Sequence, residues 1–157
     1  MKYELIEVQE HGISVVSPQV TDDEVDFSIN WAFDLDVDIP EDGKIAIKVD
    51  ARIVILQPEN QPDAGHFSAT HIFTAMTEAE ELADPEAKDK MFNFLATLVG
   101  ISLGTMRGLA FARTVNVFGS ALFMPVVNPS ELLKMNWDIV TNKLGKRNAL
   151  EKSPSER

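Results

Sequence analysis

The side chains that most often perform chemistry are few in this chain, and their spacing argues against a catalytic centre. There are three histidines, His11, His66 and His71, and no cysteine. His66 and His71 lie five residues apart in one predicted strand, so their side chains point to opposite faces and cannot share a metal ion. The absence of cysteine rules out a thiolate zinc ligand, a disulfide and a cysteine nucleophile. We therefore expect no catalytic residue, no bound metal and no cofactor.

The glycines do not form a nucleotide-binding loop either. Gly100, Gly104 and Gly108 recur at every fourth position and are followed by Ala112, which is the wrong spacing for a dinucleotide-binding fingerprint. The sequence has no phosphate-binding loop and no H-E-x-x-H or G-x-S-x-G motif. Residues four apart share one face of a helix, so these four positions form a small-residue stripe where another backbone can approach closely. We predict that this stripe packs on the sheet or on a second subunit.

Acidic residues are concentrated near the start of the chain. The 157 residues include 25 acidic and 14 basic side chains, a net charge of −11, and residues 1–43 alone hold 12 acids and one base. Such a surface repels phosphates, which argues against nucleic-acid binding. Asp34, Asp36 and Asp38 share one face of a predicted strand at spacings of about 6.5–7 Å, too far apart to surround a calcium ion. They form either a solvated sheet face or a docking surface for a basic partner.

Period-two alternation predicts four antiparallel strands in the first half of the chain. They cover residues 3–9 (continuing through 13–16 after a bend at His11 and Gly12), 31–39, 45–55 and 66–76. Apolar residues occupy one face of each strand and polar residues the other. For the second and third strands, only one register matches both faces. It places Asp36 opposite Lys48 and Val37 opposite Ile47.

Helical patterns follow the strands. An acidic linker over residues 77–90 leads into a long apolar helix over 90–118, and Asn128 and Pro129 suit the start of a final helix over 129–143. The uncharged run 94–106 is shorter than the ~20 residues that cross a bilayer, so we expect no direct membrane insertion. These patterns predict an α+β fold with one domain over residues 1–145 and a flexible polar tail over 146–157. The acidic N-terminus lacks the features of a signal peptide, so we expect a cytoplasmic protein.

Several local patterns, taken in order, resemble those of the SecB export-chaperone family. GISVVSP at residues 12–18 is similar to that family's first-strand segment, and residues 31–38 are similar to its second strand. Phe-Ala-Arg at 111–113 resembles part of the main helix, and residues 124–132 resemble the loop that connects the two helices. The resemblance covers about residues 3–137.

The resemblance implies a SecB-like sheet-and-helix fold and an ATP-independent holdase that keeps unfolded or precursor polypeptides in apolar grooves, including for protein export. It also implies a homotetramer, a dimer of dimers, in which the main helices meet. We therefore assign the small-residue stripe, Gly100, Gly104, Gly108 and Ala112, to the oligomer interface. Apolar residues of the linker and main helix either line a client groove or fill the core. They are Met91, Phe92, Phe94, Phe111 and Phe118.

The chain departs from that family at the acids that dock SecA. The matching positions hold Gly12, Val16 and Thr70. Either SecA docks instead on the acidic row at Asp34 and its neighbours, or the partner differs. The alternative function is a SecB-like binding protein for one specific partner, such as a toxin–antitoxin component. A small-ligand carrier or enzyme with a cavity at His66 or His71 is the third possibility.

Overall fold

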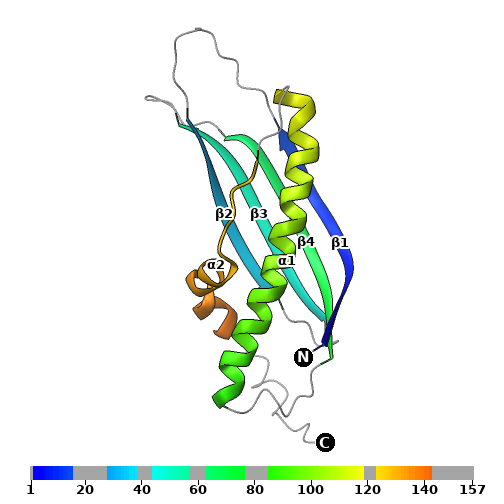
Figure 1. The fold of residues 1–157 in the computed structure, drawn as a ribbon, viewed down its shortest axis with the longest axis vertical. Coiled ribbons are helices and arrows are strands. Elements are labelled where there is room, and N and C mark those ends of the chain that lie inside the picture. The colour runs from blue at the N-terminus through cyan, green and yellow to red at the C-terminus, as the bar shows by residue number, and fades with distance from the viewer. Residues whose placement is uncertain are drawn as a thin grey trace, which may run out of the picture.

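The computed structural model describes residues 2–15, 28–38, 44–56, 63–76, 85–118 and 123–142. Four strands form one antiparallel sheet in the order β1-β4-β3-β2. A long helix, α1, lies along one face of the sheet, and a short helix, α2, packs beside it (Figure 1). The predicted α+β fold is thereby confirmed. The elements are β1 Lys2–Val15, β2 Ser28–Asp38, β3 Lys44–Leu56, β4 Asp63–Met76, α1 Pro85–Phe118 and α2 Pro129–Met135.

The predicted register of β2 and β3 is confirmed. Asp36 lies opposite Lys48, and Val37 lies opposite Ile47. Odd-numbered residues of both strands point toward α1 and are mostly buried, whereas Asp36 and its even-numbered neighbours point away. We call the first side of the sheet the helix face and the second the outer face. A shift of one residue would exchange the two sets, so burial of the apolar set fixes the register.

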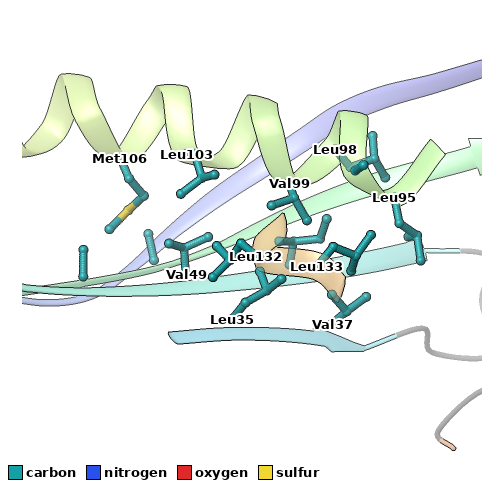
Figure 2. Close-up of a cluster of buried hydrophobic side chains, with 14 of the residues drawn as sticks. Leu35, Val37, Val49, Leu95, Leu98, Val99, Leu103, Met106, Leu132 and Leu133 are labelled. Atoms are coloured by element: carbon teal, nitrogen blue, oxygen red, sulfur yellow. The ribbon is translucent and has the colours of Figure 1, made fainter. Parts of the chain in front are cut away.

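The core lies between the helix face and the two helices. Leu95, Val99 and Met106 project from α1 toward the sheet, and Leu132 and Leu133 of α2 fill the space beside them (Figure 2). Each fully buried side chain of this size contributes about 1.5–3 kcal/mol relative to an exposed one. This burial holds α1 on the sheet.

β1 differs from its prediction. It is one strand from Lys2 to Val15 and pairs with β4 throughout, with register shifts between Leu5 and Glu7 and between Glu10 and Gly12. The expected bend at His11 is therefore an irregularity within a continuous strand. A β-bulge accommodates an extra residue without ending the pairing, which explains why the polar and glycine residues there resemble a break.

The helix bounds also differ. α1 begins at Pro85, inside the predicted linker, because proline is favoured in the first turn of a helix. The predicted cap of α2 is confirmed, since the Asn128 side chain accepts a hydrogen bond from the Ser130 backbone N–H at 3.0 Å. The predicted single helix over 129–143 is interrupted by a turn at Asn136, and residues 137–142 are helical again. The predicted tail, 146–157, lies outside the described residues.

α1 is more apolar over a longer stretch than the sequence analysis allowed. Lys88–Val115 is long and apolar enough, by length and composition, to cross a membrane. The prediction considered only the uncharged run, which ends at Arg107. A single charge does not prevent a longer apolar segment from crossing a bilayer. Half of the most apolar part is buried within the molecule, as in a helix that forms part of a protein core. A core helix can have the same length and composition as a membrane-spanning one.

Candidate binding surface

The acidic row of Asp34, Asp36 and Asp38 lies exposed on the outer face of β2. Asp34 is paired with Arg52 of β3, whose Nη2 lies 3.3 Å from Asp34 Oδ2. Asp36 lies opposite Lys48. The neighbouring strand therefore supplies positive charge along the same face, and cross-strand pairs of opposite charge stabilise a sheet. The assignment of this row to a partner stays a prediction.

A second polar cluster joins β3 to β4 on the outer face. Asp50 accepts from Lys48 Nζ at 3.1 Å and lies 3.3 Å from His66 Nε2. Burial would raise the pKa of Asp50, but hydrogen bonds from Ser68, Lys48 and His66 outweigh it and hold that pKa below 3.8. The carboxylate is thus satisfied by its neighbours. Among the described residues, no three His, Asp or Glu side chains are placed to hold a metal ion.

The apolar residues predicted to line a client groove lie in different environments. Met91 and Phe94 are buried in the core. Phe92 is half-buried and packs edge-on against Trp137, with ring centroids 5.0 Å apart. Phe118 ends α1, and its side chain lies outside the described part of the structure. Of the described members of this set, only Phe111 is exposed, so they do not form one surface.

Phe111 instead meets a segment that sequence reasoning did not assign to the site. Its ring lies 5.4 Å, centroid to centroid, from that of Phe123. Phe123 begins the extended segment, residues 123–128, which runs back along the sheet to α2 (Figure 1). Phe123 is 72% exposed and Val126 is 82% exposed, whereas Met124 between them is buried. Pro125 and Pro129, which favour extended backbone at the residues before them, were the signal that could have identified this segment.

The backbone of this extended segment is also unpaired. Among the described residues, the segment 123–127 makes no hydrogen bond. The first backbone hydrogen bond is made by Asn128, whose carbonyl accepts from the Leu132 N–H at 3.1 Å. Exposed peptide groups are satisfied by water, and they can exchange that water for another extended chain. The extended segment, together with Phe111, therefore forms the candidate binding surface.

The small-residue stripe divides into two parts. A Cβ at Gly100 would lie 3.3 Å from Cγ of Pro129, so glycine allows α2 to begin close to α1. A Cβ at Gly104 or Gly108 would meet nothing within 4 Å, and Ala112 is exposed. The first part of the stripe therefore serves packing within the chain. The second part faces open space.

Comparisons with known proteins support the fold. No protein-family model matches the chain, and neither does any curated protein. The solved structure of the SecB-like chaperone Rv1957 from Mycobacterium tuberculosis, in complex with a ChAD peptide from the Rv1956 HigA1 antitoxin, is similar. It covers 80% of this chain and 90% of that chain, with a TM-score of 0.51 and 12% identity. A protein of unknown function from Streptococcus agalactiae covers 80% of this chain and 98% of that one at 14% identity, with a TM-score of 0.32.

The sheet, the long helix and the short C-terminal helices thus define an α+β protein with a SecB-like fold. At 12% identity the similarity to Rv1957 shows the fold alone. The predicted oligomer interface and the predicted binding residues are not tested by it. The fold does, however, place the extended segment and the exposed part of α1 next to each other through Phe111 and Phe123.

Proposed function

We propose that this protein is an ATP-independent holdase that binds extended apolar segments of unfolded polypeptides at residues 123–128. The observation that carries the proposal is the combination of exposed Phe123 and Val126 with a backbone free of hydrogen bonds among the described residues. Apolar side chains provide affinity without strict sequence preference, and backbone groups pair with any extended chain. The SecB-like fold of the chain supports this class of binding.

The test compares two substitutions at equally exposed positions. Val126→Asp changes the extended segment, and Met135→Asp makes the same kind of change at the end of α2. Both side chains are 82% exposed, so neither change should greatly alter the stability of the fold. We expect Val126→Asp to weaken capture of a reduced, carboxymethylated client about tenfold, the loss that follows from one apolar contact of ~1.5 kcal/mol.

Capture is measured as suppression of client aggregation by light scattering, without nucleotide. Met135→Asp should retain the activity of the unchanged protein, and the folded client should be ignored. Equal activity of the two variants contradicts the proposed surface. No effect of the unchanged protein on aggregation contradicts the holdase function itself.

A second candidate is binding of one specific partner peptide, for instance from a toxin–antitoxin pair. The similarity to Rv1957, whose structure contains an antitoxin peptide, favours this candidate. A single tight partner would compete with the unfolded client at Val126, whereas a general holdase would bind many clients with similar affinity. Competition titrations with the two ligands separate the two functions.

Further properties follow if the resemblance to the SecB family extends beyond the fold. We propose a cytoplasmic homotetramer in which Gly104 and Gly108 face a second copy, because a Cβ at either position would meet nothing within this chain. Export through SecA receives less support. Gly12 and Thr70 replace expected docking acids, and Thr70 contacts His11 on the outer face at 2.6 Å. Light-scattering mass and a SecA binding measurement test these two properties.

A further inference from the structure

His71 is an unusual residue of the core. It lies on β4 between Val8 of β1 and Ile47 of β3, on the helix face, and its side chain is 0% exposed. Its Nδ1 and Nε2 are the only buried side-chain polar atoms without a hydrogen-bond partner in the described part of the chain. Buried polar groups are nearly always paired, because leaving one unpaired costs folding free energy. This histidine therefore requires an explanation other than structural hydrogen bonding.

The surroundings of His71 offer little to a positive charge. The helix-face neighbours on β3 and β4 are apolar, and the buried Ser102 and Thr114 of α1 donate to carbonyls of their own helix. One charged pair lies between β1 and α1, where Glu10 Oε2 accepts from Arg113 Nη2 at 3.4 Å. Glu10, which lies opposite Ala69 two residues from His71, is thus already paired. The other described charged residues of α1 with described side chains are exposed, namely Lys88, Asp89, Lys90 and Arg107.

We propose that His71 makes the packing of α1 on the sheet sensitive to acid, because protonation of its imidazole places beneath the helix a charge that has no carboxylate partner among the described residues. An imidazolium has two N–H donors, and among the described residues only the backbone of Ile47 offers compensation for the charge, short of a well-formed hydrogen bond. The neutral ring is tolerated as an apolar body. The charged ring is stable only when α1 separates from the sheet and admits water.

The direction of the effect follows from linkage. Burial lowers the pKa of His71 below its ordinary value of 6.5, and the backbone of Ile47 offsets part of that shift. The unfolded chain therefore binds a proton at a pH where the folded chain does not. The stability that the neutral His71 allows is fully present above about pH 6.5. As the pH decreases from there toward the pKa of His71 in the folded chain, the ratio of folded to unfolded protein falls, by at most about tenfold for each pH unit.

Loosening of α1 would expose its buried apolar side chains, among them Leu95, Val99 and Met106 (Figure 2). These side chains could hold clients beyond the extended segment. The acid response itself does not rest on the proposed holdase function, because helix packing is measured without a client.

The experiment compares His71→Leu with His66→Leu. His66 lies on the same strand but on the outer face, where it is half-buried beside Asp50. Urea unfolding and amide exchange of α1 are measured at pH 7.5, 6.5 and 5.5 in the unchanged protein and in both variants. We expect His71→Leu to lose the pH dependence of stability between 6.5 and 5.5, and His66→Leu to retain it.

Equal pH dependence in the unchanged protein and in His71→Leu overturns the proposal. A direct titration of His71 in the unchanged protein tests the proposal even if the variant does not fold. The His71 imidazole is followed by NMR in the unchanged protein and should remain neutral below pH 6.5 while α1 stays protected from exchange. Titration at 6.5 in the folded state, with α1 still protected, overturns the proposal as well.

Discussion

The two faces of the sheet differ in how their side chains are satisfied. On the outer face, acids of β2 and β3 have basic or hydroxyl partners on the same or the neighbouring strand, as in the pair of Asp34 with Arg52 and the cluster around Asp50. On the helix face, α1 covers the apolar residues of β3 and β4, whereas Leu5 and Val8 of β1 are exposed. The extended segment that follows α1 also leaves Phe123 and Val126 exposed. The polar face is largely satisfied within the chain. The helix side carries unsatisfied apolar surface.

This difference supports the proposed position of the binding surface. A charge that is already paired at the surface contributes little to association, because a partner must displace the existing pair and salt screens the remainder. An exposed apolar side chain beside unpaired backbone has no such competitor except water. The high net negative charge drew attention to the outer face in the sequence, whereas the contacts favour the helix side for binding.

The largest expected effect comes from substituting one residue on each face by alanine. Phe73 of β4 is buried on the helix face, and its neighbour Ile72 is half-buried on the outer face. We expect Phe73→Ala to reduce the free energy of unfolding by about 3–5 kcal/mol, because it leaves a cavity beneath α1. Ile72→Ala should cost less than half as much. Urea unfolding measures both, and equal losses would show that the outer face is also covered.

Much of the fold was predictable because strand alternation is strict where one face is buried. Val37 and Ile47 could only pair with their apolar sides together, so the register of β2 and β3 followed from sequence. The candidate site was less predictable. Met91 and Phe111 look equally apolar in sequence, but only the path of α1 over the sheet decides that Met91 is buried and Phe111 is exposed. The acid sensitivity of His71 likewise depends on neighbours from distant strands.

The small-residue stripe gives a test of intermediate size. Gly100→Val should reduce stability by about 1–3 kcal/mol, because the added methyl groups crowd Pro129 and force α2 away from α1. The measurement is urea unfolding with a probe on α2. Unchanged stability would mean that the first turn of α2 shifts without cost.

Gly104→Ala acts in the opposite direction. A Cβ at this position meets nothing within 4 Å, and alanine is favoured over glycine in a helix by about 0.8–1.0 kcal/mol. Within a single chain the substitution should therefore stabilise α1. A loss of stability that depends on protein concentration would instead reveal a second copy against Gly104, and light-scattering mass of the same variant would show the dissociation.

The smallest expected effect lies on the outer face. Asp34→Asn removes the charge that pairs with Arg52 while keeping the shape of the side chain, and the pair is largely exposed. We expect a loss of about 0.2–1 kcal/mol at low salt and less at high salt, because exposed pairs are weak and screened. Client capture should not change, since the extended segment lies on the helix side. The opposite result is that Asp34→Asn weakens capture more than Val126→Asp does, and that added salt weakens capture as well. The outer face would then be the binding surface. A paired carboxylate that still governs affinity must exchange Arg52 for a basic group of the partner.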